Sequence, residues 1–194
     1  MENNIYRYAN MIIKDHFFSV PLDYSKKQSK EITVFAREII NEKYFKKNLP
    51  YLIFFQGGPG YESPRPINFS GWIKKASCNY KILLLDQRGT GLSTPVVSKI
   101  FLDNSDEEIA NYLTLFRADN IVKDAEFIRR KLIGEKKWSV LGQSFGGFCA
   151  VHYLSFYPDS LDKVIITGGL PPLEAHCDDI YRSTYKRVIE KNKN

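Results

Sequence analysis

The feature that most constrains the fold is a G-x-S-x-G motif at residues 142–146. An apolar, strand-like stretch beginning at Trp138 precedes the motif, and a helix-like stretch follows it. A serine on such a strand-to-helix turn has a strained backbone and crowded neighbours, and glycines two residues to either side relieve the crowding. The pattern predicts that Ser144 is a nucleophile supported by Gly142 and Gly146; an ordinary glycine-rich turn is the alternative.

A second glycine-rich turn, Q-G-G-P-G at residues 56–60, follows an apolar run at 49–55. A continuous apolar run of this length is typical of a strand that is covered on both faces in a parallel sheet. The glycines leave backbone amides bare, and fixed N–H donors in a water-poor site stabilise the oxyanion of acyl transfer. We expect one donor from Gly58, or its neighbour Gly57, and the other from Phe145 after the serine.

A third turn, D-Q-R-G-T-G-L-S at residues 86–93, follows a buried-strand pattern at 81–85. Asp86 and Arg88 are expected to pair and to brace the adjoining loops, and a catalytic role for Asp86 is the less favoured interpretation. The chain contains neither G-x-x-x-x-G-K-[ST] nor G-x-G-x-x-G, so these glycines do not indicate a phosphate cradle. No cofactor is expected.

The rest of the chain predicts an α/β architecture. Apolar positions recur at helical spacing through Leu132, and Asp119 is expected to cap the start of that helix. Pro171 and Pro172 are expected to end the last strand. Alternating strands and helices predict a mostly parallel sheet with crossover helices. The segments expected to be strands or helices, besides those named above, are 10–24, 31–40, 105–116, 121–132 and 163–167.

Charge and cysteine content argue against several classes of partner. The formal charge is +6, but the lysines lie in pairs at the edges of apolar segments with carboxylates nearby, as on solvated loops, so no nucleic-acid partner is expected. Three cysteines without a CxxC spacing indicate neither a disulfide framework nor a metal site. The first residues carry no apolar core of signal-peptide length, and no later run approaches the length of a membrane span, so the sequence predicts a cytoplasmic protein without a membrane partner.

Taken together, the motifs resemble the amino-terminal part of the proline iminopeptidases, which are serine peptidases of the α/β-hydrolase fold. The resemblance rests on the turns at 56–60 and 86–93, on G-Q-S-F-G-G at 142–147 and on T-G-G-L-P-P at 167–172. Gln56 departs from the family pattern, in which many members carry histidine. The resemblance implies hydrolytic release of an amino-terminal proline from a peptide through an acyl-enzyme on Ser144.

The same resemblance divides the chain into the first part of an α/β-hydrolase core, residues 1–169, and the start of a helical cap, 170–194. It places the acid and the base of the triad downstream of that cap. His16, His152 and His176 do not fit the base's place in this layout, although His176 could face the site, so no triad acid or base is identified.

The chain is therefore expected to be a fragment with weak or no activity by itself. Its sheet should keep an open apolar edge, which predicts a complementing chain or an oligomer that covers it. Two other interpretations stay open. One is an esterase or another hydrolase with the same serine turn, and the other is a non-catalytic interaction module built on half of the fold.

Overall fold

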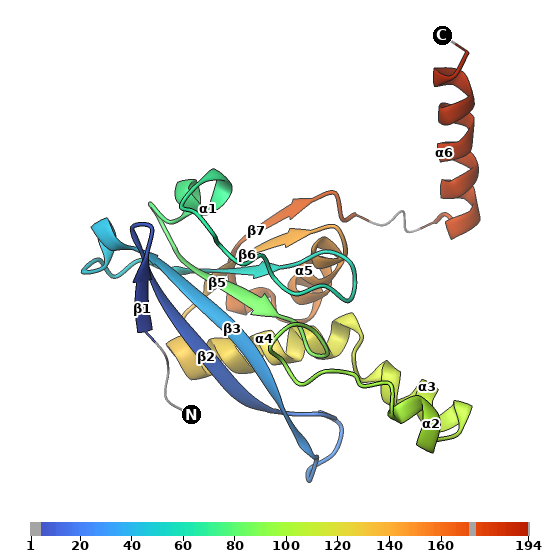
Figure 1. The fold of residues 1–194 in the computed structure, drawn as a ribbon, viewed down its shortest axis with the longest axis horizontal. Helices are drawn as coiled ribbons and strands as arrows, with labels where there is room; N and C mark the ends of the chain where they lie inside the picture. The colour runs from blue at the N-terminus through green and yellow to red at the C-terminus, as the bar shows by residue number, and fades with distance from the viewer. Residues whose placement is uncertain (1–4, 171–173, 194) are drawn as a thin grey trace.

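The computed structural model describes residues 5–170 and 174–193, in which a twisted seven-stranded sheet carries helices on both faces (Figure 1). The strands are β1 (Ile5–Tyr8), β2 (Met11–Pro21), β3 (Glu31–Asn41), β4 (Tyr51–Phe55), β5 (Lys81–Asp86), β6 (Trp138–Gln143) and β7 (Leu161–Thr167). The helices are α1 (Gly71–Ala76), α2 (Ile100–Asp103), α3 (Asp106–Thr114), α4 (Ala118–Ile133), α5 (Phe145–Phe156) and α6 (Cys177–Lys191), with short 3₁₀ turns at Glu42–Tyr44 and Pro158–Ser160. Pro171 and Pro172, expected to end the last strand, lie outside the described residues.

The sheet has the strand order β1-β2-β3-β5-β4-β6-β7. Strands β5, β4, β6 and β7 run parallel to one another, whereas β1, β2 and β3 join them through antiparallel pairs. The predicted α/β class is confirmed, and the predicted segments 10–24 and 31–40 form the antiparallel pair of strands β2 and β3. Strand β1 and helix α2 were not predicted from the sequence; each is only four residues long.

The centre of the sheet explains the two continuous apolar runs. In β4, the side chains from Leu52 to Phe55 are at most 2% exposed, and in β5 those from Ile82 to Leu85 are fully buried. Both strands have another strand on each side and helices above and below, so every position along them is buried whichever way its side chain points.

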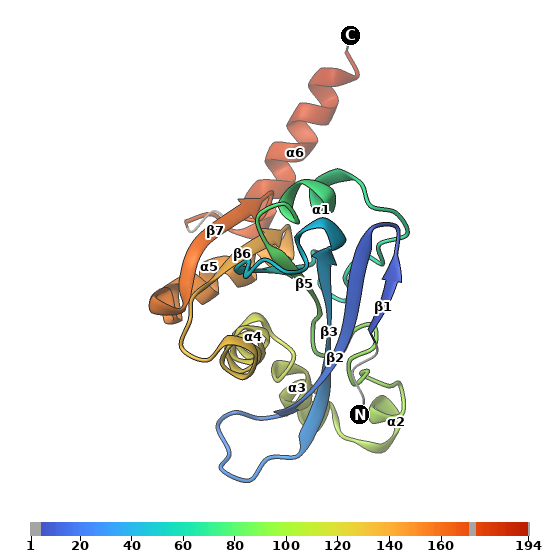
Figure 2. The ribbon, with the colours of Figure 1, turned by 90° about the vertical axis from the view of Figure 1, so that its left-hand side faces the viewer.

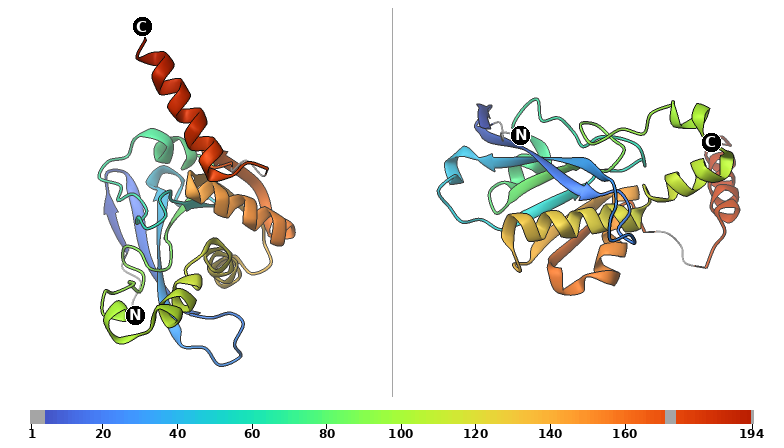
Figure 3. Two further views of the ribbon diagram at one scale, coloured as in Figure 1. Left: turned by 90° about the vertical axis from the view of Figure 1, so that its right-hand side faces the viewer. Right: turned by 90° about the horizontal axis from the view of Figure 1, so that it is seen from below.

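Helices α4 and α5 cover one face of the sheet, as the view from below shows (Figure 3). Apolar positions of α4, among them Ile121, Ala125 and Ile128, pack with Phe55 and Leu85 in one core cluster. On the other face, a smaller cluster lies beneath α1. The start of α4 differs from the expectation: Arg117 occupies the cap position, and Asp119 lies in the first turn, where its carboxylate is 3.6 Å from the Lys123 amine.

A buried polar network ties α4 to α5 and β6. The carboxylate of Glu126 accepts two hydrogen bonds from the Arg129 guanidinium and one, at 2.9 Å, from the Tyr153 hydroxyl, which in turn accepts from the Trp138 indole. The exposed guanidinium of Arg130 bonds the same carboxylate at 2.8 Å. Burial acts to raise the pKa of Glu126, but these donors outweigh it and lower the pKa to about 2.

Helix α6 stands apart from the sheet and its covering helices (Figure 1). None of its residues is buried, and it exposes apolar side chains such as Tyr181 and Tyr185. The assignment of residues 170–194 to a cap stays a prediction.

Candidate active site

Ser144 lies between the end of β6 and the first turn of α5, with its side chain exposed. Its backbone has φ 53° and ψ −120°, a region that residues other than glycine rarely adopt. Hydrogen bonds fix this conformation on both sides: the Ser144 amide donates to the Thr167 carbonyl at 2.8 Å, and the Gly147 amide donates to the Ser144 carbonyl at 2.8 Å. The turn therefore holds the hydroxyl in one position above the sheet.

The glycines around Ser144 lie where a side chain has no room. A methyl group on Gly142 would lie 2.2 Å from the carbonyl oxygen of Gly146, and one on Gly146 would lie 2.0 Å from that of Phe55. Gly169, which follows β7, is equally tight, because its methyl group would lie 2.1 Å from the Ser144 carbonyl oxygen. The turn is thus packed backbone against backbone with β4 and with the segment after β7.

The glycine-rich turn after β4 lies beside the serine. A methyl group on Gly57 would lie 3.0 Å from the Ser144 Cβ and 3.6 Å from its Oγ. Gly58 has φ 121°, a conformation open mainly to glycine, and Gln87 holds the turn by donating to the Gln56 carbonyl at 3.1 Å. On the other side of the serine, Phe145 is the first residue of α5, and the first N–H groups of a helix have no partner within it.

Asp86 and Arg88 were expected from the sequence to pair with each other, but each has a different partner. Asp86 is fully buried at the end of β5, and its carboxylate accepts two hydrogen bonds from Arg65, at 3.0 and 2.5 Å, together with the amides of Ser63 and Leu92. Asp86 therefore fixes the segment that follows the glycine-rich turn and the turn at 86–93. The prediction failed because the backbone turns between the two residues, so their side chains point into different layers.

Arg88 is the second buried anchor. Its guanidinium makes a bidentate pair with Asp124 of α4, at 2.7 and 2.6 Å, and donates to the carbonyls of Pro21, Leu22 and Leu115. These contacts use all five N–H groups of the arginine. They join the end of β2, the segment after α3 and the helix α4 at one point. Arg88 therefore positions α4, which packs against α5, the helix that begins after Ser144.

The histidines do not provide a base for Ser144. His16 lies in β2, four strand spacings of about 4.8 Å from β6, which is roughly 19 Å, and its Nε2 is 2.9 Å from Glu38. His152 is eight residues along α5, about 12 Å from the serine along the helix axis, and its ring stacks on Phe156. Burial lowers the pKa of His152, although the charge of Asp119 opposes the shift.

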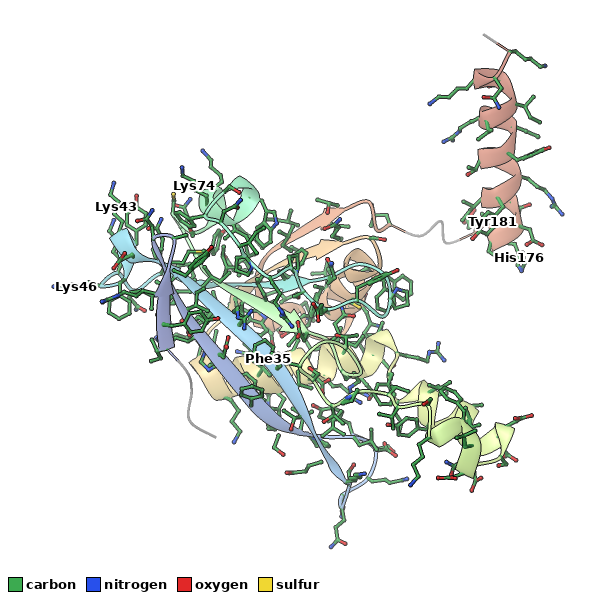
Figure 4. The ribbon with its side chains drawn as sticks, in the orientation of Figure 1. Phe35, Lys43, Lys46, Lys74, His176 and Tyr181 are labelled. Atoms are coloured by element: carbon green, nitrogen blue, oxygen red, sulfur yellow. The ribbon has the colours of Figure 1, made fainter. Side chains whose placement is uncertain are left out.

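His176 caps the start of α6 and is exposed, far from the sheet (Figure 4). Among the described residues, His176, Cys177 and Asp178 form a cluster of side chains that could bind a metal ion. These are three consecutive exposed residues, an arrangement that also occurs on protein surfaces without an ion.

An open cleft of about 470 Å³ adjoins the turn. Its walls include the rings of Phe116, Phe145 and Phe148 together with Pro59 and His152. Because Pro59 belongs to the turn at 56–60 and Phe145 follows the serine, an apolar group of a bound molecule in this cleft lies next to both turns. Cys149, one turn into α5, is buried, and burial raises the pKa of its thiol to about 12, so it is not a second nucleophile.

Two residues that shape this site were not predicted from the sequence. Arg65 lies in a proline-containing loop whose pattern gave no signal. Asp124 had a signal: it lies three residues after Ile121 and one before Ala125, on the apolar stripe of α4. A carboxylate on a buried stripe requires a buried partner, and Arg88 is that partner.

The fold and this turn define the class of the protein. The chain belongs to the α/β-hydrolase family, because the family model for the alpha/beta hydrolase fold matches residues 50–193. The proline iminopeptidase of Aeromonas sobria is 49% identical over 179 residues, which are 92% of this chain and 42% of that protein. A proline iminopeptidase of Aspergillus aculeatus is 38% identical over 167 residues, 80% of this chain and 36% of that protein. The resemblance to part of the proline iminopeptidases is confirmed, and the chain spans about two fifths of these relatives' length.

Solved structures agree on the fold. A 2-hydroxy-6-oxo-6-phenylhexa-2,4-dienoate hydrolase from a Rhodococcus species aligns with a TM-score of 0.53 at 18% identity, covering 88% of this chain and 52% of that one. A proline iminopeptidase-related protein from Thermus thermophilus aligns with a TM-score of 0.50 at 18% identity, covering 78% of this chain and 44% of that one. No helix among the described residues combines the length and the apolar character needed to cross a membrane.

Proposed function

We propose that this chain is the nucleophile-bearing part of a serine peptidase that releases an amino-terminal proline from peptides. The observation that carries the proposal is the position of the Gly57-Gly58 turn beside the Ser144 hydroxyl, on a serine whose φ is 53°. The identity of 49% to a proline iminopeptidase supports the substrate class.

In this proposal, the Ser144 hydroxyl oxygen bonds to the carbonyl carbon of the proline residue and gives its proton to a base. The carbonyl oxygen becomes an oxyanion, which the amides of Gly58 and Phe145 stabilise as fixed donors. Collapse of the tetrahedral intermediate breaks the peptide bond, and the leaving amine takes up a proton. Water then hydrolyses the prolyl ester on Ser144 and regenerates the serine.

In this proposal the base comes from outside the 194 residues, since none of the three histidines lies near Ser144, and no acid is assigned. A serine without its base retains only a small part of its catalytic power. The chain alone is therefore inert or weakly active. We also place the protein in the cytoplasm, where a reducing environment suits the three free thiols.

The test is to co-express the chain with the part of the Aeromonas sobria relative that it does not match, and to add a fluorophosphonate probe. Labelling of the wild type is expected to vanish in Ser144→Ala and to persist in Ser155→Ala, an exposed serine on α5 whose hydroxyl donates to the helix backbone. Release of proline from a prolyl-4-nitroanilide reporter should follow the same pattern.

Labelling that survives Ser144→Ala would refute the assignment of the nucleophile. Cleavage of simple esters without proline release would favour the esterase interpretation. A pure, folded complex that neither labels nor turns over would favour the non-catalytic module.

A further inference from the structure

Helix α5 carries a stripe of aromatic side chains that begins beside the candidate nucleophile. Four rings are spaced three or four residues apart along the helix: Phe145, Phe148, His152 and Phe156. Residues with this spacing share one face of a helix. The Phe145 and Phe148 rings are stacked with their centroids 6.3 Å apart, and those of His152 and Phe156 are stacked at 4.4 Å. The stripe therefore leads away from Ser144 along α5.

The stripe is separate from the face of α5 that packs on the core. Cys149, Ala150 and Tyr153 are buried in the main core cluster, where α5 lies beside α4 on one face of the sheet (Figure 2). Phe148 and Phe156, by contrast, are exposed. An exposed patch of contiguous apolar side chains, especially one rimmed by polar residues, is typical of a binding site.

The first three rings of the stripe line the open cleft of about 470 Å³. Its other walls are Pro59, the ring of Phe116 and the first turn of α4. Clefts of this volume hold molecules much larger than a single pyrrolidine ring. Along α5, the cleft extends from Phe145 to His152, which is seven residues, or roughly 10 Å at the helical rise of about 1.5 Å per residue.

The length of the cleft decides which part of a peptide can fill it. In the proposed reaction, the carbonyl group that bonds to Ser144 belongs to the first residue of the peptide, and one residue spans at most about 3.6 Å. No residue precedes it, so a prolyl group reaches only the end of the cleft nearest the serine. The leaving side of the peptide continues from the same carbonyl for further residues. It alone is long enough to extend from Phe145 to the far end of the cleft.

We propose that this cleft binds the leaving part of the peptide and selects a large apolar side chain at the residue that follows the proline. The side chain of that second residue packs against the rings of Phe116, Phe145 and Phe148, and the residues after it run on along α5. The inference rests on the proposed function, because it assigns a single proline to the acyl position. It adds a substrate class, namely peptides in which phenylalanine, leucine or a similar residue follows the first proline.

The experiment measures proline release by the co-expressed pair described above from two tripeptide amides, Pro-Phe-Ala and Pro-Gly-Ala. Burial of the larger side chain favours the first substrate, so its kcat/KM should be about tenfold higher. In Phe148→Ala, which removes one wall of the cleft, that ratio should fall to about threefold or less. Phe45→Ala is the matched control, because Phe45 follows the 3₁₀ turn at Glu42–Tyr44 and is 47% exposed, against 44% for Phe148. It should leave the ratio unchanged.

A binding measurement on the 194-residue chain alone keeps the test independent of turnover. The dipeptide amide Phe-Ala is the leaving product of the better substrate, and in an NMR titration it should bind about tenfold more tightly than the amide Gly-Ala. Phe148→Ala should remove most of this difference, whereas Phe45→Ala should keep it. Both positions are exposed, so circular dichroism of each variant should match the wild type.

Proline release with equal kcat/KM for the two tripeptides, or with a ratio that survives Phe148→Ala, would overturn the inference and uphold the proposed function. Equal turnover of alanyl-alanyl-prolyl-4-nitroanilide and prolyl-4-nitroanilide would place the cleft on the acyl side and overturn the inference. So would a failure of Phe148→Ala, but not of Phe45→Ala, to assemble with the second polypeptide, because that polypeptide would then be the occupant. Selective binding of the Phe-Ala amide without proline release from any substrate would refute the proposed function and leave the cleft as an apolar peptide site.

Discussion

The buried guanidinium of Arg88 gives the sharpest test of how this fold is held together. Its side chain is fully buried, and that of Asp124 is 1% exposed. Replacing Arg88 by methionine keeps much of the volume but leaves a carboxylate buried without a cation. It also removes the donors from the carbonyls of Pro21, Leu22 and Leu115.

Removing one partner of a buried ion pair costs about 3–5 kcal/mol. The loss of three further hydrogen bonds places Arg88→Met near the upper end of that range. Water that enters the site and hydrates the freed carbonyls keeps the loss from being larger. Total stabilities of native proteins are about 5–15 kcal/mol, so the variant should lose a large share of its free energy of unfolding. With a urea m-value of about 2.5 kcal/mol/M, a loss of about 5 kcal/mol moves the midpoint down by roughly 2 M.

The assay is urea unfolding of the purified chain, followed by circular dichroism and by the fluorescence of buried Trp138. Arg130→Met is the matched control, because that arginine also bonds a carboxylate but its side chain is 61% exposed; it should cost less than about 1 kcal/mol. The double variant Arg88→Met with Asp124→Leu should recover part of the loss, since no unpaired charge remains. Equal midpoints for Arg88→Met and Arg130→Met would refute the reasoning.

Two further predictions follow from pKa values. Because the pKa of Glu126 is lowered to about 2 from 4.5, its ionised form stabilises the fold above pH 4.5, and this stabilisation is lost as the pH falls toward 2. Glu126→Gln should therefore cost roughly 2 kcal/mol at pH 6 and much less at about pH 2.5 by urea unfolding, and a constant difference would contradict it. The exposed thiols of Cys78 and Cys177 should react with iodoacetamide in the native chain, whereas Cys149, with its pKa raised to about 12, should react only after unfolding; mass spectrometry of the native chain would contradict this by finding Cys149 alkylated.

Local patterns predicted the elements that carry the candidate site. The apolar runs of β4 and β5 predicted buried strands, because continuous hydrophobicity has no other stable place in a sheet of this kind. The motif around Ser144 predicted its turn, because only glycine fits at Gly142 and Gly146, where any side chain would meet backbone atoms. Short elements such as β1 and α2 carry too few residues for a periodic signal.

The same local patterns could not predict which side chains pair across long distances in the sequence. Asp86 and Arg88 are two residues apart and were expected to pair, yet their partners are Arg65 and Asp124, which lie 21 and 36 residues away along the chain. Spacing in sequence limits which residues can meet but does not select among the distant partners that the layers bring close.

The sequence by itself determined the fold class, the strained serine turn and the glycine-rich turn after β4, because each depends on steric limits within a few residues. Only the tertiary structure decided that Gly57 lies beside the Ser144 hydroxyl, and that His16 lies several strands away from it. Those facts depend on how strands from distant parts of the chain are ordered in the sheet, and strand order is set by the packing of the whole core.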